Sequence, residues 1–111
     1  MILVVTCIKL KSPLHFFALA NNARLILNQL KKTQYAGFKK KGFWTTHYTI
    51  SLWNNESDMK AFASSGAHLK AMQQSAKIAK EIRTATVNYT EMPSWEVALK
   101  LLENGKVFLY D

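Results

Sequence analysis

A single histidine stands in the small and largely apolar stretch SSGAHLKAM, residues 64–72. The unperturbed pKa of imidazole lies near neutrality, so His68 is a candidate general base for proton transfer at ordinary pH. The alternative is a structural role, because a histidine near the start of a helix often hydrogen-bonds to backbone or solvent. No carboxylate stands close to it in the sequence to orient the ring, so the residues alone leave both roles open.

His47 lies in the stretch FWTTHYTISLW, residues 43–53, whose composition and alternation predict a strand. In that strand His47 shares a polar, uncharged face with Thr45 and Thr49. The imidazole on this face either lines a pocket or accepts a cross-strand hydrogen bond. Asn21, inside a predicted helix, can point its amide into the same pocket, although exposed helix asparagines are common.

The sequence lacks the motifs of several common kinds of chemistry. It contains no Ser-His-Asp order, no CxxC pair, no HExxH motif and no glycine-rich phosphate loop. Hydrolase, zinc-enzyme and P-loop interpretations are therefore without support. Cys7 is the only cysteine, so an intramolecular disulfide cannot form. Its place in an apolar strand predicts a packed thiol, and a reducing cytoplasm is the expected compartment.

The length of 111 residues suits one domain, which we expect to span residues 1–111. Hydrophobic residues make up 49% and charged residues 20%, which is typical of a globular protein. The 15 Lys and Arg against 7 Asp and Glu give a formal charge of +8, which favours anionic partners without choosing among them. The apolar run at the start ends at Lys9, so we expect no membrane span.

Hydrophobic periodicity divides the chain into strands and helices. Ser12 and Pro13 begin the first helix, and Gly66 breaks or bends the second. Beyond Gly66 we expect an inner apolar stripe through Leu69, Met72, Ala76 and Ala79. The expected order is strand 2–10, helix 12–32, strands 33–38 and 43–53, a helix from Asn54 or Asn55, strand 82–90, a helix from Pro93 that ends at Gly105, and strand 106–110.

The run KKK, residues 39–41, lies between the predicted strands 33–38 and 43–53. With Gly42 near the turn, we expect these lysines at the solvated tip of a β-hairpin, where their charge discourages pairing with another sheet. Contact with an anionic partner is the alternative interpretation of this run.

The order of elements predicts a ferredoxin-like βαββαβ sandwich of the α+β class, with an appended C-terminal helix and strand. Its helices cover one face of the sheet and leave the other to be covered by something else. Because the first strand is apolar on both faces, and Ala85 and Val87 add to the uncovered side, that face is too apolar for water. A homodimer that packs sheet against sheet is the simplest cover.

Residues 43–72, FWTTHYTISLWNNESDMKAFASSGAHLKAM, resemble the dimeric α/β barrel proteins, and within them the antibiotic-biosynthesis-monooxygenase and spheroidene-monooxygenase-like families. The likeness consists of a strand that ends in Trp53, an acidic helix start, the run AFASSGAH and the AM after it. It implies a dimeric α/β barrel with a ligand pocket between helices and sheet. Members are cofactor-free oxygenases, haem-degrading or haem-using oxygenases, isomerases or proteins of no known activity, so the fold does not select the function.

The resemblance implies a monooxygenase-like protein that binds a small apolar or aromatic molecule, with enzymatic activity itself left open. The expected catalytic residues are His68 and His47. The expected ligand-binding residues are Phe62, Met72, Trp53, Tyr48 and Asn21. Haem and no cofactor at all are equally compatible with it. Phe62 falls where haem-degrading members carry a tryptophan and Met72 where they carry the axial histidine, so His68 would have to serve as the haem ligand; no other metal is expected.

Two other classes of function stay open. The RNA-recognition motif has the same order of strands and helices, and KGFWTTHY, residues 41–48, partly matches its third-strand signature. The first strand contains LVVTCI, which lacks the aromatic residue that such a motif uses to stack a base, so nucleic acid is the less favoured partner. The second alternative is a non-catalytic module that binds a small ligand or another protein.

Overall fold

The computed structural model describes residues 1–110. The strands are β1 (Ile2–Leu10), β2 (Gly37–Phe43), β3 (Thr46–Trp53), β4 (Ala79–Asn88) and β5 (Lys106–Leu109). The helices are η1 (Pro13–His15), α1 (Phe16–Leu30), α2 (Glu56–Ala63), α3 (Gly66–Ile78) and α4 (Trp95–Glu103). The order of these elements confirms the ferredoxin-like α+β fold with an appended helix and strand.

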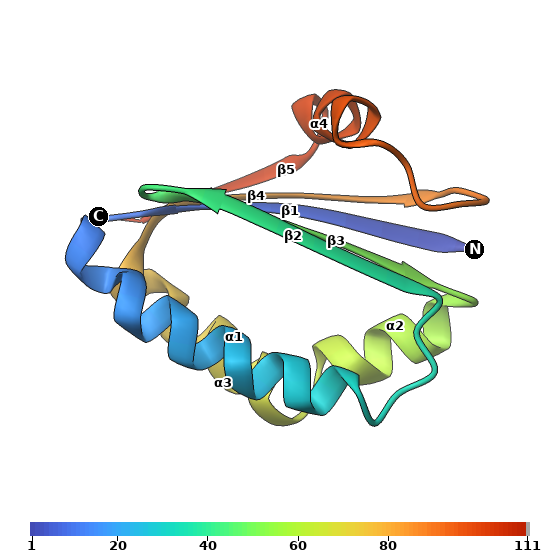
Figure 1. The fold of residues 1–111 in the computed structure, drawn as a ribbon, viewed down its shortest axis with the longest axis horizontal. Coiled ribbons are helices and arrows are strands. Elements are labelled where there is room, and N and C mark those ends of the chain that lie inside the picture. Colours follow the sequence, from blue (N-terminus) through green and yellow to red (C-terminus); the bar gives the residue numbers. More distant parts are fainter. Residues whose placement is uncertain (111) are drawn as a thin grey trace.

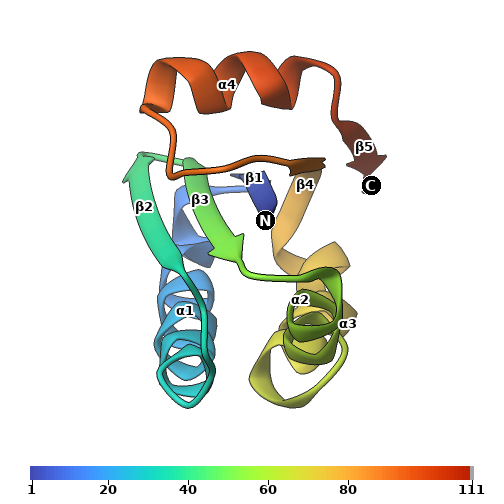
Figure 2. The ribbon, with the colours of Figure 1, turned by 90° about the vertical axis from the view of Figure 1, so that its right-hand side faces the viewer.

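The five strands form one antiparallel sheet in the order β2-β3-β1-β4-β5. β1 lies at its centre and pairs with β3 on one side and β4 on the other (Figure 1). Leu3, for example, stands between Leu52 and Val87. β1 has α4 on one face, where its side chains are buried, and α1–α3 on the other, where they are half-buried (Figure 2), which explains why it carries apolar side chains at nearly every residue.

The best-packed core lies between the sheet and α4. α1, α2 and α3 cover one face of the sheet, and α4 crosses the other (Figures 1 and 2). Under α4, Val5 and Ile50 of the sheet are fully buried, as is Ala98 of the helix. From the sequence we expected a second protomer to cover this face of the sheet. In the structure, α4 of the same chain covers part of it (Figure 2).

The face toward α1–α3 is polar at its centre and is not sealed by the helices. Thr6 and Thr84 share a hydroxyl contact of 3.2 Å there, and both are half-buried. Thr49 of β3 and Thr86 of β4, which lie on the same face by register, are exposed. The expected polar, uncharged strand face therefore exists, on the side of the sheet that carries α1–α3.

The lysine run is not at the hairpin tip. β2 continues to Phe43, so residues 39–41 lie within this edge strand and the turn consists of Trp44 and Thr45. Lys41 lies 4.9 Å from the ring centroid of Trp95, a cation–π contact with the start of α4. Gly42 pairs with His47, where a β-carbon would collide with the imidazole ring. The close approach of that ring, rather than a turn, explains this glycine.

Gly66 divides α2 from α3 as expected, with a φ of +59° that favours glycine. The expected inner stripe of the second helix is displaced by one residue. The side chains that α3 buries or half-buries are His68, Ala71, Gln74, Ser75 and Ile78, together with Ala67 in its first turn. Leu69, Met72 and Ala76 are exposed instead, and Ala79 is the first residue of β4, which begins three residues earlier than predicted.

Candidate functional site

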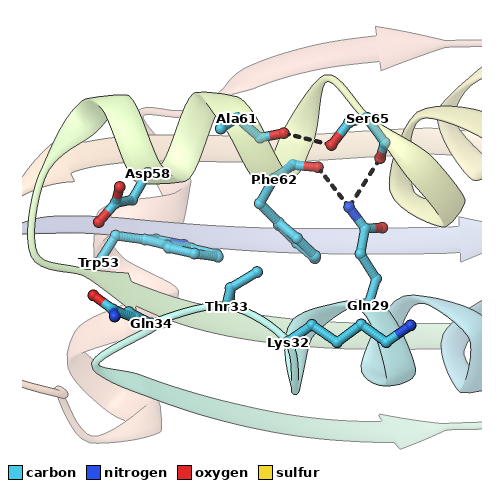
Figure 3. Close-up of a pocket in the computed structure, with 9 residues that line it drawn as sticks. All are labelled: Gln29, Lys32, Thr33, Gln34, Trp53, Asp58, Ala61, Phe62 and Ser65. Carbon is cyan, nitrogen blue, oxygen red and sulfur yellow. Dashed lines mark hydrogen bonds between the residues drawn. The ribbon is translucent and has the colours of Figure 1, made fainter.

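A pocket opens where the end of α1, the helix α2 and the end of β3 meet (Figure 3). Its volume is about 390 Å³, within the range of small-molecule sites. Figure 3 shows Trp53 and Phe62 at its centre, with Asp58 and Lys32 toward opposite ends. The site therefore combines an aromatic middle with charged groups at the rim.

Three aromatic rings stand in a row beside this pocket. The ring centroids of Trp53 and Phe62 are 5.1 Å apart with an interplanar angle of 33°, and those of Phe62 and His68 are 5.1 Å apart at 54°. Trp53 is 1% exposed and its indole N–H donates to the Ser51 hydroxyl at 3.0 Å. Trp53 is therefore the satisfied, fixed floor of the pocket, and Phe62 is the wall that a ligand can touch.

Gln29 near the end of α1 holds the junction between α2 and α3. Its amide nitrogen donates to the carbonyls of Phe62 at 3.2 Å and Ser65 at 3.0 Å (Figure 3). Its amide oxygen accepts from the backbone N–H of His68 at 2.9 Å. One side chain thus satisfies backbone groups at the end of one helix and the start of the next, and it fixes where Phe62 and His68 sit.

Replacing Gln29 with Leu is expected to lower the free energy of unfolding by about 1–3 kcal/mol, because three backbone hydrogen bonds are lost in a partly buried place. The exchange of the His68 amide proton with solvent should accelerate in the same variant, since its acceptor is gone. Urea unfolding and hydrogen exchange measure the two effects. Gln73→Leu, an exposed change on α3, is the control; equal exchange at His68 in both variants would contradict this role for Gln29.

His68 is held as a neutral imidazole with a defined tautomer. Its Nδ1 lies 3.0 Å from the carbonyl oxygen of Ala63, and because a carbonyl only accepts, Nδ1 carries the proton. Burial lowers the pKa of His68, with the hydrogen bond to Ala63 partly opposing the shift. Within residues 1–110 no hydrogen bond reaches Nε2, so this nitrogen presents a free lone pair at neutral pH.

His47 lies away from this site. Its Nε2–H donates to the Trp44 carbonyl oxygen at 3.1 Å, and the centroid of its ring lies 5.7 Å from that of the Phe16 ring. Trp53 lies six positions further along the same strand, about 20 Å away at the rise of a β-strand. The two histidines therefore do not form one constellation, and His47 joins the hairpin turn to the start of α1.

Three predicted ligand-binding residues also lie elsewhere. Tyr48 is on the α4 face, 6.3 Å from the ring of Trp95, and burial raises the pKa of its hydroxyl. Asn21 is exposed and accepts from Arg24 at 3.0 Å. Met72 is 56% exposed on α3. Of the seven residues predicted for the site, the structure brings together Trp53, Phe62 and His68.

Haem does not fit these residues. Met72, which occupies the axial-ligand place in the resemblance, points largely into solvent. The ring of Phe62 packs against both Trp53 and His68, and His68 does not line the pocket, so with Phe62 in this position the imidazole does not reach the iron of a porphyrin in the pocket. Within residues 1–110, no three His, Cys, Asp or Glu side chains gather to hold another metal.

A second hollow of about 600 Å³ lies between α4 and β4. It is lined by aliphatic side chains such as Val87, Val97 and Leu101, with Lys100 at its edge. Although it is larger, its lining includes no imidazole, carboxylate or aromatic ring. The pocket beside Phe62 is therefore the better candidate for a site of chemistry.

Sequence comparison gives no match to a protein family model, and none to a curated protein. Comparison with solved structures gives several matches. A conserved protein from Methanosarcina mazei Go1 superposes with a TM-score of 0.71 at 13% identity, over 80% of this chain and 92% of that one. SnoaB from Streptomyces nogalater, named a cofactor-independent oxygenase, gives 0.60 at 9% identity over 82% and 94%. A protein named antibiotic biosynthesis monooxygenase gives 0.68 at 9% over 84% and 100%.

At these identities the likeness establishes the fold. The chain has the ferredoxin-like fold of antibiotic-biosynthesis-monooxygenase-like proteins over most of its length, as residues 43–72 predicted. Gln29, Lys32 and Asp58 are the site residues that sequence reasoning missed. Asp58 carried one signal, as an acidic residue in the first turn of a helix; Gln29 and Lys32 carried none, because their role depends on how α1 ends against α2.

Proposed function

We propose that this protein is a monooxygenase-like enzyme that binds a small aromatic molecule in the pocket beside Phe62 and works without haem. The observation that carries the proposal is the row of rings Trp53, Phe62 and His68, spaced 5.1 Å apart. A flat ligand ring gains offset-stacking and burial against such a row. The charged side chains of Lys32 and Asp58 at the rim supply the few polar groups that orient a ligand.

The chemistry that suits these residues starts with proton removal. His68, neutral and with the Nε2 lone pair free, acts as the base on a CH₂ group made acidic by a neighbouring carbonyl and aromatic rings. The carbanion then reacts with O₂. Overall, CH₂ and O₂ give C=O and H₂O, with one oxygen atom in the product and one in water, and the substrate supplies all the electrons. Phe62 separates the pocket from His68, so its ring has to turn aside for the proton to be transferred.

The same fold in SnoaB, named a cofactor-independent oxygenase, supports this direction. A non-catalytic binding module would use the same pocket and form no product, so the assay below separates the two. The RNA-recognition alternative loses support, because α4 lies across the sheet face that such a motif keeps open for bases (Figure 2).

Anthrone, a three-ring ketone with an acidic CH₂, is a suitable probe. In the absence of O₂ we expect saturable quenching of tryptophan emission by anthrone, with an affinity about tenfold lower for Phe62→Ala, because the wall of the pocket is lost. Met72→Ala, an exposed change on α3, should bind like the native chain. Admission of O₂ should then give anthraquinone. Equal affinity of all three proteins would mean that the ligand binds elsewhere. A Soret shift on titration with hemin that depends on His68 would contradict the proposal that the protein works without haem.

We further propose that the protein acts as a homodimer in the cytoplasm. β5 ends its pairing at Thr84, so the edge of β4 from residue 85 onward has no partner strand within residues 1–110. The aliphatic hollow along this edge and the exposed Val97 that lines it suit a second copy of the chain. The mass in solution, measured by light scattering, distinguishes the dimer from the monomer.

A further inference from the structure

Four large apolar side chains are exposed at the end of the molecule where β2 turns into β3. Phe43 is 85% exposed and Trp44 is 71% exposed at the hairpin tip; Leu14 is 81% and Phe17 is 77% exposed at the start of the helical layer. We call these four residues the hairpin-end patch. Side chains of this size at such exposure are unfavourable in water, and when clustered they mark an interaction surface.

The two halves of the patch are joined through Phe16 and His47. The ring of Phe16 lies 6.1 Å from that of Phe17 and 5.7 Å from that of His47, whose Nε2 stands 3.1 Å from the Trp44 carbonyl oxygen. Figure 1 shows the hairpin tip and the start of α1 at the same end of the molecule. The patch is therefore a single projecting end, well away from the pocket beside Phe62.

Trp44 is placed there at a conformational cost. It is the first residue of a two-residue turn and has a φ of 57°, in the left-handed region. Tight hairpin turns usually have glycine at this place, and a bulky residue in this region is strained. Folding recovers little of that cost, because the Trp44 side chain stays largely exposed. A tryptophan that is both strained and exposed indicates a role in binding a partner, because it does not stabilise the fold of its own chain.

The charge around the patch is basic. Lys11 and Lys41 lie at or next to the strand ends at this end of the molecule; the Lys11 ammonium donates to the Ala76 carbonyl at 2.6 Å, and Lys41 lies over the ring of Trp95. Glu81 is the only acidic residue of the five strands within the described chain, and it is paired with Lys9 at 3.4 Å. With a formal charge of +8 for the whole chain, this end attracts anionic surfaces.

We propose that the hairpin-end patch docks the protein on an anionic lipid bilayer, with Phe43 and Trp44 inserted at the level of the headgroups. Tryptophan and phenylalanine on a basic surface are the combination that binds the interface of membranes rich in anionic lipid. A second copy of the chain is disfavoured as the occupant, because two such ends would bring their lysines together. Single-stranded nucleic acid is also disfavoured, because Leu14 offers no ring on which a base stacks.

The test is co-sedimentation of the native protein with vesicles of phosphatidylcholine alone and of phosphatidylcholine mixed with phosphatidylserine. We expect binding to the mixed vesicles, weakening as salt is added. Trp44→Gly is the decisive variant, since it relieves the turn and removes the ring. We expect its affinity for vesicles to fall about tenfold while its melting temperature rises. Phe43→Ser should weaken binding similarly, and Met72→Ser, an exposed apolar change on α3, should leave it unchanged.

Three results would overturn the proposal. The first is no binding to mixed vesicles at low salt. The second is vesicle binding that is unchanged in Trp44→Gly and Phe43→Ser, because binding would then be due to charge and not to insertion of the rings. The third is a dimer in solution, or a complex with single-stranded oligonucleotide, that the same two variants abolish while neither affects vesicle binding.

Discussion

Replacing His68 with Asn is expected to slow the oxygenation of anthrone by about 10²–10⁴-fold, the usual contribution of a general base. Asparagine places its NH₂ group near the position of Nδ1, so the hydrogen bond to the Ala63 carbonyl can be kept while the Nε2 lone pair is removed. Oxygen uptake and anthraquinone formation measure the rate. His15→Asn, at the last residue of η1, where the imidazole contacts the Ser12 hydroxyl, is the matched control and should react like the native protein.

The pH dependence follows from the direction of the pKa shift. Because burial lowers the pKa of His68, the native rate should be independent of pH around neutrality and fall only as pH drops through that lowered pKa. Stability should follow the same direction: the unfolded chain binds the proton more readily, so His68 costs stability as pH falls below about 6.5. His68→Asn should lack this acid-side loss. Equal rates for His68→Asn and the native protein would exclude the base.

Replacing Trp53 with Ala is expected to lower the free energy of unfolding by about 3–5 kcal/mol, as for other large aromatic residues removed from a core. Trp53 is 1% exposed, packs against Phe62 and donates its indole N–H to Ser51. Its removal opens a cavity at the end of β3 and leaves the Ser51 hydroxyl without this partner. A domain of this size is usually stable by about 5–15 kcal/mol, so the loss is a large share of the total.

Urea unfolding of Trp53→Ala, Trp53→Phe and Trp95→Ala separates size from chemistry. Trp53→Phe keeps most of the ring area and should lose much less stability than Trp53→Ala. Trp95 is only half-buried and lies under Lys39 and Lys41, so Trp95→Ala should lose less as well. A loss below about 1 kcal/mol in Trp53→Ala would mean that this ring does not support the pocket.

The fold class and the order of elements could be predicted from the amino-acid sequence, because these depend on local periodicity. A strand apolar on both faces, a Ser-Pro helix start and a glycine between two helical stripes are signals carried within a few residues of each element. The resemblance over residues 43–72 was sufficient to indicate monooxygenase-like proteins, and structural comparison bears it out at the level of the fold.

The register of the hairpin and the inner face of α3 depend on contacts between elements, which local periodicity does not record. Gly42 suggested a turn, but the ring of His47 lies against it, and that contact joins residues on opposite strands. The stripe of α3 shifted to His68, Ser75 and Ile78 because α1 packs beside it. Exposed and buried apolar residues alternate too closely on a short helix for the sequence to choose between them.

Tertiary structure also decided what the candidate site contains. Trp53, Phe62 and His68 were named from the sequence, and the fold sets them in one row. Tyr48 and His47 lie in the same strand as Trp53, yet one faces α4 and the other stands at the far end. Gln29 entered the site only because α1 ends against the α2–α3 junction. Contacts between residues distant in the chain depend on how the elements pack, and no local pattern records them.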